Sequence, residues 1–167
     1  LAMKAYNEYS ISCLENLVGN VEEKENIALG KKVNASINNV PTNPTDNLTD
    51  GNKETTWIGE SNVSSFDLTV DLEAESSIDG MEISLKQIAG GFPYTYKVEV
   101  FSENQWNVVA QNDDVETTTQ TFIAYKGILR NVRSTFITND PSIIHDVADL
   151  PIYDNVEEQP TYNNFTV

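Results

Sequence analysis

Alternation of apolar and polar residues marks most of this chain as β-structure. Residues 66–72 alternate strictly, which is the pattern of a strand with one buried and one solvated face. Residues 81–85 and 96–100 repeat the pattern, and residues 121–125 and 132–137 follow it less regularly. Many short strands separated by turn residues predict an all-β fold, and specifically a β-sandwich.

The N-terminal segment has a different spacing. Its apolar and small residues recur at helix-like intervals: Leu1, Ala5, Tyr9, Ser12, Cys13, Leu14 and Leu17. Because Gly19-Asn20 is typical of a helix C-terminus, we expect a short helix over residues 1–20, as the end of an upstream domain. Residues 21–25 are then an acidic linker, residues 26–154 the sandwich, and residues 155–167 a linker or the start of a following domain.

The charge of the chain excludes two classes of partner. Ten basic residues stand against 26 acidic ones among 167, for a formal net charge of −16. Such a charge repels phosphate backbones and anionic membranes, so we expect neither nucleic acid nor membrane as a partner. No stretch approaches the ~18 apolar residues of a membrane span. Cys13 is the single cysteine, so no intrachain disulfide can form.

Templates of enzyme active sites fit the sequence poorly. His145 is the only histidine, and it has no favourable spacing with Cys13 for nucleophilic catalysis or for a zinc site. The paired carboxylates Asp113-Asp114 and Glu157-Glu158 stand in polar stretches, whereas glycosidase chemistry needs two carboxyls across a desolvated cleft. We therefore expect a non-catalytic chain.

One turn concentrates oxygen donors. Asp50 and Asn52 flank Gly51, which frees the backbone to bend sharply, and Thr55 adds a hydroxyl three residues later. Calcium takes six to eight oxygen ligands from carboxylates, amides, hydroxyls and carbonyls. The pattern fits a calcium loop, although a plain polar Asp-Gly turn between strands accounts for the same residues, and the EF-hand pattern is absent.

Several separated motifs, taken in order, resemble one family. They are Asn26–Ser36, the loop 47–57, the strand 66–72, and the segments 78–83, 96–102, 106–109, 131–133 and 147–153. Their order and intervals resemble the discoidin domain, also called the coagulation factor 5/8 type C domain, over roughly residues 26–154. Within that superfamily the chain looks most like the carbohydrate-binding modules of family 32. The resemblance implies a galactose-binding-like jelly-roll β-sandwich.

The resemblance also implies a structural calcium ion. In modules of this type the ion is held by such a loop together with a strand near the C-terminus. Carried over to this chain, the ligands are the carbonyl of Asn47, Asp50, Asn52, Thr55, the carbonyl of Ala148, and Asp149. The last position is usually Glu in the family, and the shorter Asp149 reaches less far.

Sugar binding is the function that the resemblance implies, on loops at one end of the sandwich. A flat aromatic face packs on the C–H side of a pyranose while polar groups bind its hydroxyls. The best candidate is the loop 86–94, and its expected contacts are Phe92, Tyr94, Lys86 and Gln87. The alternative for Tyr94 is that it begins a strand and covers the core.

One departure from the family bears on the sugar. Galactose-binding members commonly carry His, Arg and Asn in the binding loops, whereas here Lys86-Gln87 stands at the Arg position and His145 falls late. A galactose-type ligand and another mono- or oligosaccharide both stay open. Trp57 and Trp106 match packing positions, and Arg133 is expected to hydrogen-bond between strands.

These inferences predict a carbohydrate-binding module from a larger secreted or surface-bound bacterial enzyme, expected to be a glycoside hydrolase. Its partners would be a glycan and neighbouring domains of the same chain. Two alternatives belong to other classes: a protein-interaction or adhesion domain, and a structural spacer without sugar binding.

Overall fold

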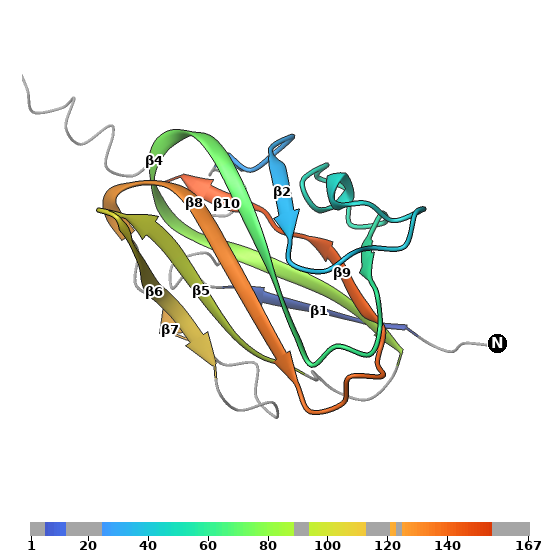
Figure 1. Ribbon diagram of the computed structural model, residues 1–167. Coiled ribbons are helices and arrows are strands. Elements are labelled where there is room, and N and C mark those ends of the chain that lie inside the picture. The colour runs from blue at the N-terminus through green and yellow to red at the C-terminus, as the bar shows by residue number, and fades with distance from the viewer. Residues whose placement is uncertain (1–5, 13–24, 89–93, 113–120, 123–124, 155–167) are drawn as a thin grey trace, which may run out of the picture.

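Strands make up most of the computed structural model, which describes residues 6–12, 25–88, 94–112, 121–122 and 125–154 (Figure 1). A single 3₁₀ turn, η2 (Thr45–Leu48), is the helical element among the described elements. The strands are β1 (Tyr6–Ser12), β2 (Lys32–Ala35), β3 (Trp57–Gly59), β4 (Ser65–Ile88), β5 (Tyr94–Ser102), β6 (Gln105–Asn112), β7 (Thr121–Phe122), β8 (Tyr125–Thr138), β9 (His145–Asp149) and β10 (Ile152–Asp154). No helix in these ranges is long and apolar enough to cross a membrane.

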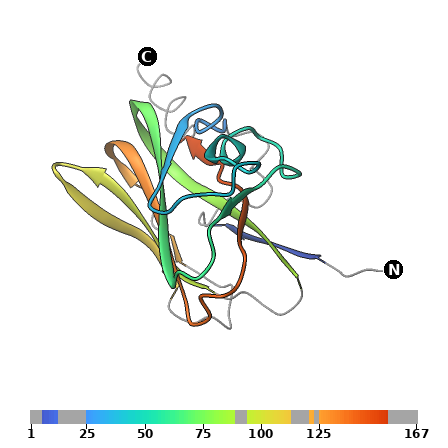
Figure 2. The ribbon, with the colours of Figure 1, turned by 45° about the vertical axis from the view of Figure 1, so that its right-hand side comes forward.

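The long strand β4 joins the two layers of the sandwich. Its first part pairs antiparallel with β8, from Ser65↔Ile137 to Asp71↔Asn131, and with β2. The register then shifts between Asp71 and Ser76, and the last part of the strand pairs with β9 and β1. Figure 2 shows the two layers, with β8, β5 and β6 on one side and β9 and β1 on the other. A break in register lets one strand bend from one sheet into the next.

The strands β5 and β6 form a hairpin with a short turn. Only Glu103 and Asn104 connect the strands, and their φ angles are +57° and +66°. Positive φ at both central residues characterises the turn whose twist matches the flanking strands. β5 in turn pairs with β8 along its length from Tyr94↔Thr138 to Phe101↔Asn131.

The N-terminal helix prediction is wrong for Tyr6–Ser12. These residues form β1 and pair with β4 in seven consecutive steps, from Tyr6↔Ile88 to Ser12↔Glu82. Apolar residues at intervals of four also obey the period of two that a strand requires, so the spacing fits both structures. Pairing with the free edge of the last part of β4 selects the strand. The remainder of the predicted helix and the C-terminal residues 155–167 lie outside the described residues.

Aromatic rings fill the core at one end of the sandwich. Phe66 lies at the centre, with ring centroids 5.4 Å from Trp57, 5.7 Å from Tyr94, 5.1 Å from Phe136 and 4.9 Å from His145. Offset and edge-on arrangements of this kind add to the stabilisation from burial. The predicted strands 66–72, 81–85, 96–100 and 132–137 are all confirmed, and their alternating apolar residues form this core.

Candidate functional site

The oxygen-rich turn after η2 is ordered by its own side chains. Asp50 accepts hydrogen bonds from the backbone N–H of Asn52 to Oδ1 at 2.9 Å and from the hydroxyl of Thr55 to Oδ2 at 2.5 Å. Gly51 has φ of +75°, and a Cβ there would stand 3.0 Å from the side chain of Leu29. Both facts favour glycine at this position. The turn therefore collects three of the predicted calcium ligands.

Backbone contacts tie this turn to the C-terminal strands. The N–H of Leu150, which follows β9, donates to the carbonyl of Leu48 at 3.0 Å. The Asn47 side chain donates to the carbonyl of Thr56 at 2.8 Å, which closes the turn on itself. The structure thereby brings the end of β9, with Ala148 and Asp149, to the turn that carries Asp50.

Asp149 is the least satisfied acid in this region. Only 5 % of its surface is exposed, and its Oδ1 is buried without a hydrogen-bond partner in the part of the chain that the structure describes. Burial raises the pKa of its carboxyl to about 6, and the charges of Asp50 and Glu82 act in the same direction, while a backbone hydrogen bond from Leu150 lowers it. A buried carboxylate oxygen without a partner is costly, and a bound cation removes that cost.

The donor chemistry of this region fits a hard cation. No three His, Cys, Asp or Glu side chains gather into a metal-binding group anywhere in the described ranges. The predicted ligands include only two carboxylates, Asp50 and Asp149, and the other donors are amide, hydroxyl and carbonyl oxygens. Such mixed oxygen sets are characteristic of calcium rather than of transition metals.

Sequence reasoning missed two charged residues beside these ligands. Lys53, within the turn, lies 3.7 Å from the carboxylate of Glu82 on β4. Lys53 lowers the pKa of Asp149 and Glu82 raises it, so both act on the buried carboxylate. Glu82 is about thirty residues from the turn, and no signal in the sequence connects the two.

The burial of Tyr94 corrects its prediction as a sugar contact. Its side chain is fully buried, and its hydroxyl lies 2.7 Å from Nδ1 of His145. The alternative interpretation is the right one, because Tyr94 begins β5 and covers the core. Burial also raises the pKa of its phenol far above the usual value.

The other expected sugar contacts fall where the structure describes less. Phe92 lies outside the described residues. The backbones of Lys86 and Gln87 belong to β4 and pair with Glu8 and Asn7 of β1, while their side chains lie outside the description. Their assignment as sugar contacts therefore stays a prediction.

His145 is a core residue held in one tautomer. Its Nε2 lies 3.2 Å from the carbonyl of Val63, which can only accept, so Nε2 carries the proton and Nδ1 accepts from Tyr94. Burial lowers the pKa of the imidazole, which favours the neutral ring. The histidine thus joins the start of β9 to the start of β5.

The structural roles predicted for Trp57, Trp106 and Arg133 are confirmed. Trp57 is completely buried in the core. Arg133 on β8 donates from Nε and Nη2 to one carboxylate oxygen of Glu99 on β5, at 3.1 and 3.0 Å. The same guanidinium stands 4.0 Å over the ring of Trp106 on β6, so that indole packs against a side chain that reaches across β5.

Taken together, the sandwich, the shared strand β4 and the turn beside β9 define a discoidin-type domain. The sequence profile of the F5/8 type C domain family matches residues 32–146, and the chain belongs to that family. No curated protein matches the chain.

Solved structures of carbohydrate-binding modules share the fold. CpGH89CBM32-4 of Clostridium perfringens, in complex with GlcNAc-α-1,4-galactose, has a TM-score of 0.63 and 24% identity over 78% of this chain and 94% of that one. Chitosan-binding module 1 of a chitosanase/glucanase from Paenibacillus sp. IK-5 has a TM-score of 0.60 and 18% identity over 77% and 98%. A Ruminococcus gnavus GH29 fucosidase in complex with fucose has a TM-score of 0.63 and 21% identity over 83% and 29%. At these identities the likeness establishes the fold.

Proposed function

We propose that this chain is a non-catalytic carbohydrate-binding module that holds a larger, secreted bacterial carbohydrate-active enzyme, such as a glycoside hydrolase, at its glycan. The observation that carries the proposal is the likeness of the whole sandwich to a module in complex with a disaccharide, within a shared domain family. A tethered module raises the effective concentration of glycan near the enzyme without adding chemistry.

The proposed sugar contacts are Lys86 and Gln87 at the end of β4 and Phe92 in the segment between β4 and β5. Tyr94 is not among them, because its side chain is buried and its hydroxyl bonds His145 in the core. An aromatic ring packs on the C–H face of a sugar while polar side chains bind its hydroxyls. A single shallow site of this kind binds weakly, which is sufficient for a module that acts by proximity.

We further propose a structural calcium ion at the turn beside β9. The carbonyls of Asn47 and Ala148 and the side chains of Asp50, Asn52, Thr55 and Asp149 would hold it. The buried, unpartnered Oδ1 of Asp149 supports the assignment, because a divalent cation would supply the positively charged partner that this oxygen lacks. The ion would fasten the turn to the end of β9, so its binding adds to the free energy of folding.

Retention on immobilised glycans tests the binding function. Replacing Phe92 by Ala removes the proposed stacking face, and retention should fall about tenfold. Ile137→Ala is the matched control, because Ile137 is an exposed apolar residue on β8. Unchanged retention of a folded Phe92→Ala variant would remove this ring from the site, and a wild-type chain that no glycan retains would favour the structural spacer.

A further inference from the structure

A cleft lies at the end of the sandwich where β4 bends from one layer to the other. Its volume is about 470 Å³. Three segments line it: residues 73–75 at the register shift of β4, residues 101–104 at the β5–β6 hairpin, and residues 128–130 near the start of β8. None of these segments contributes to the proposed calcium turn or to the loop 86–94.

The cleft is remote from the proposed sugar-binding loop. Tyr94 is the first residue of β5 and Ser102 the last, so the two sites lie at opposite ends of a nine-residue strand. At the usual rise of a β-strand, that separation is roughly 25–30 Å. A ligand in the cleft therefore occupies a separate site, and its binding can be measured independently.

One wall of the cleft is apolar and fixed. Ile128 is 55 % exposed although it belongs to a central strand, and Phe101, which also lines the cleft, is held by an edge-on contact with Trp106 at 5.1 Å. Leu129 closes the wall from the core side. A rigid apolar surface inside a cleft of this size suits the C–H face of a sugar ring.

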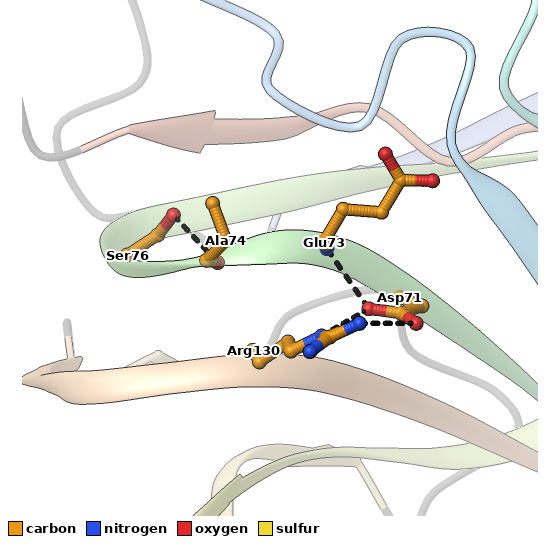
Figure 3. A network of polar contacts seen from close by, with 5 residues as sticks. All are labelled: Asp71, Glu73, Ala74, Ser76 and Arg130. Carbon is orange, nitrogen blue, oxygen red and sulfur yellow. Dashed lines mark hydrogen bonds and ion pairs between the residues drawn. The ribbon is translucent and has the colours of Figure 1, made fainter.

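The polar wall carries excess negative charge. Arg130 donates from Nε and Nη2 to the two carboxylate oxygens of Asp71, at 2.8 and 3.3 Å, and Glu73 donates its N–H to Asp71 at 2.8 Å (Figure 3). In this bidentate ion pair the positive charge of Arg130 offsets the negative charge of Asp71. The exposed residues Glu73, Glu75 and Glu103 also line the cleft, and Figure 3 shows the carboxylate of Glu73 turned away from Arg130 and β8.

The backbone has a constrained conformation at three residues that line the cleft. Glu73, Glu103 and Asn104 all have φ between +57° and +67°, a region that residues with side chains adopt only at a cost. Each is held by a neighbouring constraint, either the Asp71 hydrogen bond or the two-residue hairpin. The main chain of these two cleft segments is therefore held in a defined conformation.

We propose that this cleft binds an oligosaccharide of amino sugars, with ring faces on Ile128 and Phe101 and protonated amino groups toward Glu75 and Glu103. Carboxylates only accept hydrogen bonds, so they select a ligand rich in hydroxyl and ammonium donors. They also repel acidic sugars. This inference takes from the proposed function only the class of ligand, a carbohydrate. The residues that line the cleft are different from those of the loop 86–94.

Isothermal titration with a glucosamine oligosaccharide at pH 5.5 tests the proposal, with the N-acetylated oligosaccharide of equal length as the neutral comparison. The full chain should bind the amino form more tightly. The double substitution Glu75→Gln and Glu103→Gln should weaken that binding about tenfold or more, since two charge-assisted contacts are lost. Glu54→Gln with Glu60→Gln is the matched control, because both residues are exposed acids elsewhere and the net charge changes equally.

A second variant and a mapping experiment locate the site. Ile128→Ala should weaken binding without unfolding the chain, because more than half of the side chain is exposed. Amide shifts on titration should centre on residues 73–75, 101–104 and 128–130, and Phe92→Ala should leave the affinity unchanged. Equal weakening in the control pair, shifts confined to the loop 86–94, or binding of a lysine-rich peptide in place of the sugar would each overturn the proposal.

Discussion

The hydroxyl of Tyr94 donates a hydrogen bond to Nδ1 of His145 across 2.7 Å in the core of the sandwich. Nε2 of the same ring lies 3.2 Å from the carbonyl of Val63, so one imidazole connects the starts of β5 and β9 and the segment before β4. Both side chains are fully buried. The residue that the sequence suggested as a sugar contact is thus part of the core.

Removing the Tyr94 hydroxyl tests this relationship. In Tyr94→Phe, Nδ1 of His145 loses its donor inside the core, so the free energy of unfolding should fall by about 1–2 kcal/mol. Urea denaturation measures the loss. Glycan affinity well below the unfolding transition should stay unchanged, whereas a large loss of affinity with unchanged stability would return Tyr94 to the binding surface.

Acid should destabilise the chain through His145. Burial lowers the pKa of His145 in the folded state, while the unfolded value is near 6.5. Below that pH the unfolded chain binds the extra proton, so the stabilisation is complete above pH 6.5 and is lost as the pH falls. Unfolding free energies between pH 5 and 7.5 should show this slope in chelator, most clearly with Asp149→Asn. A flat profile in that variant would contradict the neutral, buried ring.

Asp149→Asn should have opposite effects with and without calcium. The folded-state pKa of Asp149 is about 6, above its usual value of 3.8, so its ionisation costs stability as the pH rises through 6. In chelator at pH 7 the amide should stabilise the chain by about 1–2 kcal/mol, since residual solvent contact screens part of that cost. With calcium present, the wild-type chain should be the more stable one.

The pH dependence of the calcium effect gives an internal check. In the wild-type chain, the rise in melting temperature on adding calcium should shrink as the pH falls below about 6, because protons compete for Asp149. Magnesium at the same concentration is the control ion. If calcium shifted the melting temperature of Asp149→Asn as much as that of the wild type, the ion would be bound elsewhere.

Gly51→Ala should loosen the same turn. The backbone at Gly51 has φ of +75°, and an added Cβ would meet the side chain of Leu29 at 3.0 Å. We expect a loss of about 1–2 kcal/mol in stability and a weaker response to calcium. Gly30→Ala is the matched control, because Gly30 has φ of +76° and open space around it. A Gly51→Ala chain as stable as Gly30→Ala would show that the contact with Leu29 is easily relieved.

Local patterns in the sequence predicted the central strands, because their side-chain alternation records which face is buried. The same patterns failed at the N-terminus, where intervals of four fit a helix and a strand equally, and only the free edge of β4 distinguishes them. The turn at Asp50 was visible because its donors are close in sequence. The contact of Glu82 with Lys53 and the cleft at Ile128 could not be predicted, because both are formed by segments that lie far apart along the chain.

The most direct test of the account is a glycan array probed with the whole chain in calcium and again after chelation. The account predicts binding to a defined class of sugars, reduced in Phe92→Ala and unchanged in Ile137→Ala, with weaker binding after chelation if the turn supports the site. A blank array from a chain that unfolds cooperatively, in calcium as well as in chelator, would contradict a carbohydrate-binding function.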